Sequence, residues 1–304
     1  MRGPDSLTQE KPHRVAEREG QLHSTLVLTT VAMVAFAANS LLARQALGIP
    51  VIDPAGYTAL RVISGAVVLY LLFRWRSGSA QSGRVPGNWL AAMALFIYAI
   101  AFSAAYVELG AATGALILFS SVQATMLAYA LLRGDRPSLS EAFGLAVAFA
   151  AFVYLVLPGA GRPDPVGSLL MIVSGMAWAA YTLLGRGSVD PLGETAGNFV
   201  RASAFCIPLG LYAAFRETAT SSGVLLALAS GIVASGLGYA IWYRALRGLT
   251  TFRAALIQLS VPVIAAAGAI VLLGETLTLH FVGASAIVLA GIAFAILAKQ
   301  KRQA

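Results

Sequence analysis

Two segments of the sequence each place one serine and two aromatic side chains on a single helical face. The residues are Ser174, Trp178 and Tyr181 in one segment and Ser235, Tyr239 and Trp242 in the other, spaced i, i+4 and i+7 in both. Side chains at this spacing lie one above another on a helix. Two such faces in contact would form a pocket wall suited to amphipathic solutes with an apolar or aromatic part. The alternative is that the tryptophans pack between helices or anchor at a membrane interface.

Polar side chains elsewhere in apolar segments are further candidates for contact with a solute. They are Asn39, Tyr98, Ser121, Gln123, Gln258 and Ser260. Pro262 removes a backbone donor and frees a carbonyl one turn back, which together with Gln258 would suit an α-ammonium group. Hydrogen bonds between neighbouring helices would use the same residues with no ligand present.

Charged side chains inside apolar segments need partners, because hydrocarbon does not solvate them. Arg61 and Arg201 lie about seven residues inside their predicted helices. Each would neutralise a substrate carboxylate or bind backbone carbonyls, and the second role is favoured because the two approach opposite membrane faces. Glu108, at the outer end of its segment, is the candidate carboxylate for proton coupling, since no Asp or Glu lies near a segment centre. Arg44 and Arg186 end their segments and are expected to extend to the membrane surface.

The composition places these segments in a membrane. Of the 304 residues, 58% are hydrophobic and 11% are charged, whereas soluble domains carry roughly 25% charged residues. The net charge of +8 lies in connectors and tails, so nucleic acid is not an expected partner. Cys206 and the widely separated His13, His23 and His280 provide neither a disulfide framework nor a metal-ligand cluster. We therefore predict no metal and no cofactor.

The chain is predicted to be an all-α integral membrane protein with ten transmembrane helices, because runs of ~20 apolar residues span a bilayer. The ten segments, separated by charged, Gly-containing or Pro-containing connectors, cover residues 24–46, 54–74, 88–108, 111–132, 140–158, 166–186, 194–215, 222–243, 249–273 and 277–298. Residues 1–23 are predicted to form a disordered tail and residues 299–304 a second tail. One side of this topology holds sixteen Lys and Arg residues, against Arg162 and Arg216 on the other. The positive-inside rule therefore places both tails in the cytoplasm.

The sequence repeats itself at separations of 137 to 142 residues. The matching pairs are "AFAANSLLAR" (35–44) with "AWAAYTLLGR" (177–186), "AGYTALR" (55–61) with "AGNFVR" (196–201), Tyr106 and Leu109 with Tyr243 and Leu246, and "LLRGD" (131–135) with "VLLGE" (271–275). They divide the chain into five-helix repeats over 24–158 and 166–298. Because five is odd, the second repeat enters the membrane from the opposite side, which is the inverted arrangement of many secondary transporters. Asn39 against Tyr181 is the position where the first pair differs in chemistry.

These features resemble the drug/metabolite transporter superfamily, EamA type. The resemblance covers residues from about 25 to 298 and rests on the ten helices, the two arginines, the two Tyr-x-x-Leu motifs and "LSVPVIAAAGAIVLLGETLTLHFVGASAIVLAGI" (259–292). The first half departs from this last signature with Val122 in place of Pro262 and Asp135 in place of Glu275. The resemblance implies that the protein is a bacterial exporter and not an enzyme. It also implies that amino acids, including aromatic ones, are the first expected substrates.

Alternating access around a central cavity is the mechanism that this architecture implies. Spans one, three, four, six, eight and nine are expected to line that cavity, in the cytoplasmic membrane of a bacterium. Alternatives are export of other metabolites or drug-like compounds, a channel, or a membrane-embedded enzyme. The last of these lacks an intramembrane nucleophile with its base. The sequence leaves the oligomeric state open and is compatible with a monomer.

Overall fold

The computed structural model describes the backbone of residues 10–77, 85–134, 138–156, 162–185, 188–216, 219–246, 249 and 257–303. Nearly all of these residues are helical, and no strand occurs within these ranges. The helices are α1 (Glu10–Leu47), α2 (Pro54–Ser77), α3 (Trp89–Glu108), α4 (Ala111–Leu132), α5 (Leu139–Val156), α6 (Pro165–Leu184), α7 (Pro191–Arg216), α8 (Ser221–Ala229), η3 (Ser230–Leu237), α9 (Gly238–Leu246), α11 (Ser260–Leu273) and α12 (Leu279–Gln303).

The predicted all-α fold of ten helices is confirmed over the described residues. The segments α8, η3 and α9 follow one another without a break and form one rod, in which η3 is a π-helical stretch. Each predicted span corresponds to one of these helices within the described residues, and the helix of the span 249–273 is described from Ser260 to Leu273. The helices begin where the sequence supplies caps: Asn88, Asp164 and Thr220 accept hydrogen bonds from the backbone N–H three residues later. Gly274 ends α11 in a left-handed conformation, with φ of 65°.

The two ends of the chain differ from the prediction. The structure already places residues from Glu10 onward in α1, whereas residues 1–23 were expected to be disordered. At the other end, α12 continues to Gln303, through most of the predicted tail. Lys, Arg, Glu and Gln are good helix formers, so charged residues next to a formed helix extend it by one hydrogen bond each.

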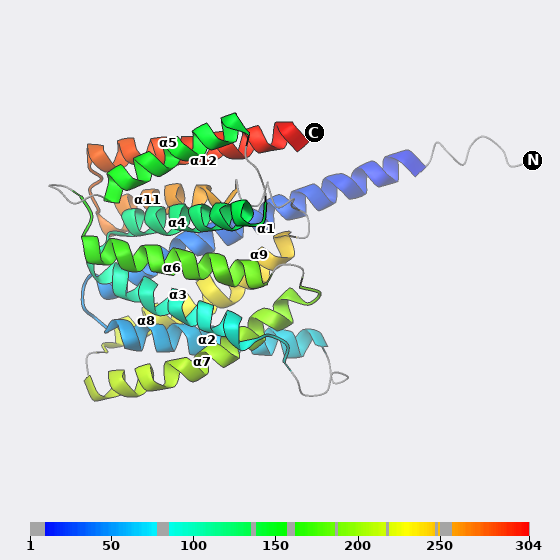
Figure 1. The fold of residues 1–304 in the computed structure, drawn as a ribbon. Helices are drawn as coiled ribbons and strands as arrows, with labels where there is room; N and C mark the ends of the chain where they lie inside the picture. The colour runs from blue at the N-terminus through cyan, green and yellow to red at the C-terminus, as the bar shows by residue number, and fades with distance from the viewer. Residues whose placement is uncertain are drawn as a thin grey trace, which may run out of the picture.

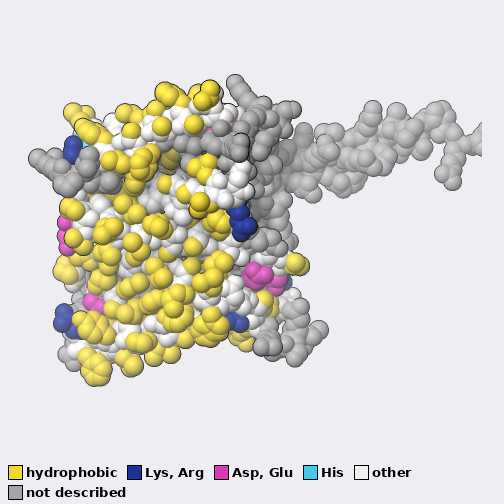
Figure 2. All heavy atoms as spheres, viewed as in Figure 1, with side chains coloured by type: hydrophobic (Ala, Val, Ile, Leu, Met, Phe, Trp, Pro, Cys, Tyr) yellow, Lys and Arg dark blue, Asp and Glu magenta, His cyan; other side chains and the backbone are white. Residues whose placement is uncertain are grey.

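The surface is apolar between the two ends of the bundle, as lipid contact requires. Six helices of the described chain are long and apolar enough to cross a membrane. Shorter apolar stretches lie in α4, α5, α11 and α12. Exposed leucines and valines such as Leu26, Leu71 and Val263 point outward from several helices. Figure 2 shows hydrophobic side chains over most of the visible face, with Lys, Arg, Asp and Glu mostly near its two ends.

The packing of the helices has the symmetry of an inverted repeat. Helix α3 packs on α6 as η3 and α9 pack on α1, and α4 packs on α6 as α11 packs on α1. The helices α2 and α7 also contact each other, as do α4 and α11, and α5 and α12. In each of these contacts a helix packs on its own counterpart from the other repeat. In Figure 1, α1 and α6 cross the bundle in opposite directions, while α12 ends at the side on which α1 begins. The two five-helix halves are therefore antiparallel, and they contact each other across the whole bundle, from α5 with α12 at one edge to α2 with α7 at the other.

Candidate functional site

Aromatic side chains from α3, α6 and α9 form a cluster at the contact between the two halves. The Trp178 ring centroid lies 4.9 Å from that of Tyr98 and 5.1 Å from that of Tyr239. Both contacts are tilted, an arrangement that aromatic quadrupoles favour. The two polar and aromatic faces predicted from helical spacing therefore do contact each other, through Trp178 on one helix and Tyr239 on the other.

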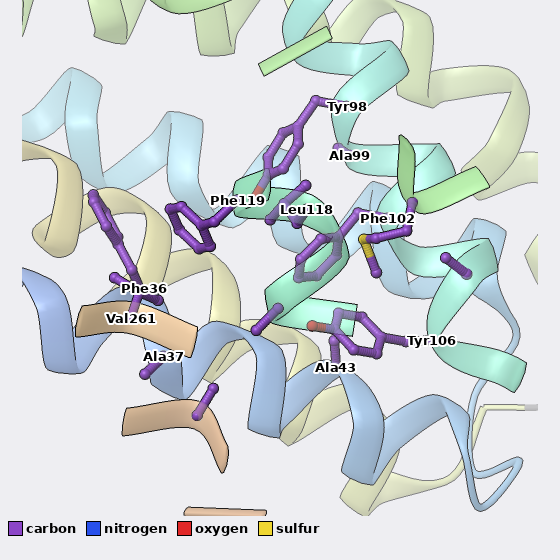
Figure 3. Packing of buried hydrophobic residues seen from close by; sticks show 14 of the residues in the cluster. Phe36, Ala37, Ala43, Tyr98, Ala99, Phe102, Tyr106, Leu118, Phe119 and Val261 are labelled. Carbon is purple, nitrogen blue, oxygen red and sulfur yellow. The ribbon is translucent and has the colours of Figure 1, made fainter. Parts of the chain in front are cut away.

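Two phenylalanines that the sequence analysis did not single out complete this aromatic cluster. The Phe36 ring of α1 makes edge contacts with Tyr239 at 5.7 Å and with Trp242 at 5.9 Å between centroids. Phe119 of α4 lies between Phe36 and Tyr98 in Figure 3. A phenylalanine in an apolar helix has the same sequence signature as a packing residue, so no pattern could have distinguished these two.

The aromatic cluster surrounds a small central cavity of about 20 Å³. Its lining residues are Phe36, Asn39, Ser40, Tyr98, Phe102, Leu118, Phe119, Trp178, Ala234 and Tyr239. These residues belong to α1, α3, α4, α6, η3 and α9, so five of the six predicted spans contribute. Span nine, represented among the described residues by α11, does not. A cavity of this size holds roughly one water molecule, so the structure shows the site closed.

A chain of buried polar groups runs along one side of the cavity. Ser230 donates to Asn39 Oδ1 at 2.6 Å, and Asn39 Nδ2 donates to the Tyr98 hydroxyl at 3.4 Å. Ser174 donates to the Tyr98 carbonyl at 3.0 Å and so ties α6 to α3. Asn39 thus lines the cavity as predicted from the break in the repeat. Its counterpart Tyr181 is buried on the side of α7 and contacts the cavity only through the Trp178 ring.

The π-helical segment η3 explains how the eighth span reaches these groups. A π-helix adds a residue to the turn, and such segments occur frequently at functional sites. Ser230 and Ser235, near the two ends of η3, bind Asn39 and Arg61 respectively, and both serines are buried. The related helix of the first half, α3, is α-helical along its whole length. The two halves therefore differ in backbone register at the site.

Arg61 lies in the bundle interior beside this cavity, with 2% of its surface exposed. Its Nη2 donates to the Tyr98 hydroxyl at 2.8 Å, and its Nε donates to Ser235 Oγ at 3.2 Å. The guanidinium carbon also lies 4.6 Å from the centroid of the Phe102 ring. These partners are hydroxyls and rings, so the predicted carbonyl-binding role does not describe the Arg61 side chain.

Arg201 does have the predicted carbonyl-binding role. Its Nη1 donates to the carbonyls of Pro86 at 3.1 Å and Gly197 at 2.9 Å, and its Nη2 donates to that of Val85 at 3.3 Å. The arginine therefore fastens the segment that precedes α3 to the side of α7. Because its three hydrogen bonds all go to backbone carbonyls, Arg201 is part of the packing.

The other predicted polar residues lie away from the cavity lining. The hydroxyls of Ser121 and Ser260 donate within their own chain segments, to the carbonyls of Ile117 and Ile257 at 2.7 Å each. Gln123 and Gln258 are half-buried on α4 and just before α11. These four residues were expected to bind the substrate, but none of them is among the lining residues, to which α4 contributes Leu118 and Phe119 instead.

Glu108 and Pro262, two further residues that the sequence analysis singled out, lie at the ends of helices. Glu108 is exposed at the last residue of α3, outside the buried interior. Pro262 lies in the first turn of α11, where its missing donor leaves no intrahelical bond unmade. Residues 250–256, which precede this turn, lie outside the described part of the chain, as do Asp135 and Arg186.

A second cavity of about 320 Å³ opens at the end of the bundle where α1 ends. It is lined by Arg44, Gly110, Thr113, Leu155, Arg162, Pro163, Glu275, Thr276, Leu277, Thr278, His280 and Phe281. Arg44, which was expected to extend to the membrane surface, is partly exposed in this cavity. Its Nε lies 3.6 Å from Glu275 Oε1, and its Nη1 donates to the carbonyls of Tyr106 and Val107. Glu275 Oε1 also accepts the Ala111 N–H at 2.8 Å, which joins α1, the α3–α4 turn and the end of α11.

We expect Glu275→Gln to lower the free energy of unfolding by about 0.5–1 kcal/mol, because it removes the charge of a partly exposed ion pair. Glu275→Ala should lose about 1–3 kcal/mol, since the Ala111 N–H also loses its acceptor. Thermal unfolding of the purified protein at low and high salt measures both effects. The difference between wild type and Glu275→Gln should shrink at high salt, where the ion pair is screened. Equal melting temperatures for all three proteins would contradict this interpretation.

Antiparallel five-helix halves with a closed polar and aromatic site between them define a multi-pass membrane transporter. Residues 165–297 match the model of the EamA-like transporter family. An uncharacterized protein of Pseudomonas aeruginosa is 49% identical over 92% of this chain and 97% of its own length. The chain belongs to the EamA-like transporter family, within the drug/metabolite transporter superfamily. It is a transporter of small metabolites in the membrane and not an enzyme.

More distant relatives agree with this assignment. The threonine/homoserine exporter RhtA of Escherichia coli is 29% identical over 83% of this chain and 84% of its own length. An uncharacterized transporter of Archaeoglobus fulgidus is 27% identical over 83% of this chain and 90% of that protein. One crystal structure shares the fold with a TM-score of 0.62 at 20% identity, over 93% of this chain and 99% of that one.

Proposed function

We propose that this protein exports amino acids, apolar and aromatic ones included, by alternating access around the central cavity. The observation that carries the proposal is the aromatic cluster of Trp178, Tyr98 and Tyr239, which surrounds polar groups at the contact between the two halves. Rings supply contact area for an apolar side chain, while Asn39 and Tyr98 offer hydrogen bonds to the polar end. The similarity to a threonine/homoserine exporter supports this substrate class.

The proposed orientation places both termini in the cytoplasm. The excess of Lys and Arg on the side of the tails supports cytoplasmic termini in the cytoplasmic membrane of a bacterium. A closed central cavity of about 20 Å³ has to open toward each end in turn to pass a solute. Small residues between the helices permit such tilting, because they interlock weakly.

Counterflow in proteoliposomes tests the proposal directly. Vesicles loaded with unlabelled threonine, homoserine, leucine or phenylalanine should accumulate the labelled form of the same amino acid, with saturation at high concentration. Protein-free vesicles and the Trp75→Ala variant, which changes a side chain that is 85% exposed, are the controls. Absence of saturable exchange for all twenty amino acids would exclude the amino-acid assignment. Linear, unsaturable flux would indicate a channel.

A further inference from the structure

Arg61 is a buried cation that forms no ion pair within the described part of the chain. Neither ion pair recorded among the described residues includes Arg61, and its hydrogen bonds go to two neutral hydroxyls. Its Nη1 has no hydrogen-bond partner among the residues that the structure describes. A buried charge without a counter-ion is unfavourable by several kcal/mol, so such a group usually marks a function.

The Tyr98 side chain lies between the Arg61 guanidinium and the central cavity. Tyr98 and Phe102 line the cavity on one side and contact the guanidinium, whose carbon is 5.1 Å and 4.6 Å from their ring centroids. Ser235, which accepts from Arg61 Nε, follows Ala234 of the cavity lining. A small displacement of Tyr98 would therefore expose the guanidinium to a bound solute.

We propose that Arg61 binds the carboxylate of the transported solute and that the Tyr98 hydroxyl occupies this place while the site is closed. The inference rests on the proposed function and makes it more specific: the substrate carries a carboxylate on an apolar or aromatic body. An arginine presents parallel N–H donors that match the two oxygens of a carboxylate. Nη1 and Nη2 then bind the substrate, while Nε stays on Ser235.

The repeat explains why only one of the two arginines has this role. In "AGYTALR" the arginine follows the glycine by five residues, and in "AGNFVR" by four. One residue corresponds to about 100° around a helix axis. Arg61 consequently faces the site, whereas Arg201 faces the segment before α3 and binds its carbonyls. A single carboxylate site suits a single asymmetric solute between two symmetric halves.

Pairs of ligands that differ only in the carboxylate test the assignment. In proteoliposomes we compare the transport of leucine and leucinamide, and on purified protein we compare thermal stabilisation by phenylacetate and phenylacetamide. Wild type should prefer each carboxylate by about tenfold or more, the effect of a charge-assisted hydrogen bond. Arg61→Gln should abolish this preference without a loss of thermal stability, because it removes an uncompensated buried charge. Arg61→Lys, which keeps the charge, should retain part of the preference.

The outcomes separate this inference from the proposed function. If Arg61→Gln transports leucine and still prefers the carboxylate, the inference is wrong and the amino-acid export stands. If wild type transports no amino acid but phenylacetate stabilises wild type and not Arg61→Gln, the export proposal is wrong and the carboxylate site stands. A matched change at the packing arginine, Arg201→Gln, should lower the melting temperature and leave the carboxylate preference unchanged. If Arg61→Gln does not fold, a carboxylate preference that is weaker in Arg61→Lys than in wild type still supports the site, and equal preference in the two contradicts it.

Discussion

Trp178→Ala is expected to lower the rate of amino-acid counterflow about tenfold or more while the protein still folds. Trp178 contacts the rings of Tyr98, Tyr239 and Tyr181 at centroid distances of 4.9, 5.1 and 5.5 Å. Each aromatic pair contributes about 0.5–1.5 kcal/mol beyond its buried area, and about 1.4 kcal/mol corresponds to a factor of ten. Because Trp178 is half-buried and lines the cavity, its indole is available to a solute when the site opens.

The control for this prediction is the same substitution at a tryptophan outside the site. Trp75→Ala removes an indole that is 85% exposed and should leave transport unchanged. Trp178→Phe keeps a ring and should restore most of the rate for leucine. If Trp178 served packing alone, Trp178→Ala would lower transport of phenylalanine and threonine by the same factor. A larger loss for phenylalanine than for threonine is the result expected from direct contact with the solute.

The helices could be predicted from the sequence because their boundaries are local. Proline, glycine and charged residues interrupt the apolar runs, and residues such as Asn88 and Thr220 cap the helices that follow. The helical conformation of residues 10–23 was not predicted, because extension of a formed helix into polar sequence leaves no apolar signal. The π-helical turn of η3 was also not predictable, since it depends on contacts with α1 and α2.

The site residues that share a helical face could be predicted from their spacing in the sequence. The partners of the buried arginines could not, because they depend on contacts between helices. The faces with Trp178 and Tyr239 contact each other as spacing predicts, and Asn39 lines the cavity. In contrast, Arg61 and Arg201 have similar sequence contexts but different partners. The one-residue difference in their spacing from the glycine indicates that they face different sides of their helices, but the atoms that each arginine meets belong to other helices and to a connector, which the local pattern does not encode.

Gly197→Ala is expected to lower the free energy of unfolding by about 3 kcal/mol or more, at the upper end of the effects of overpacking. A Cβ atom at Gly197 would lie 1.5 Å from the Pro86 carbonyl oxygen. That oxygen also accepts from Arg201 Nη1 at 3.1 Å, so any movement that relieves the clash disturbs this hydrogen bond as well. A backbone atom cannot rotate away as a flexible side chain can. The segment before α3 would therefore have to leave α7.

The measurement is thermal unfolding of the purified variant, for which a loss of this size corresponds to roughly 5–10 °C. Gly283→Ala is the matched control, because a Cβ atom at Gly283 of α12 meets no atom within 4 Å. That substitution should leave stability unchanged or raise it slightly, since alanine is the better helix former. Equal melting temperatures for Gly197→Ala and Gly283→Ala would mean that α7 and the segment before α3 are not in close contact. The carbonyl-binding role of Arg201 would then lose its structural basis, and the contrast with Arg61 would rest on Arg61 alone.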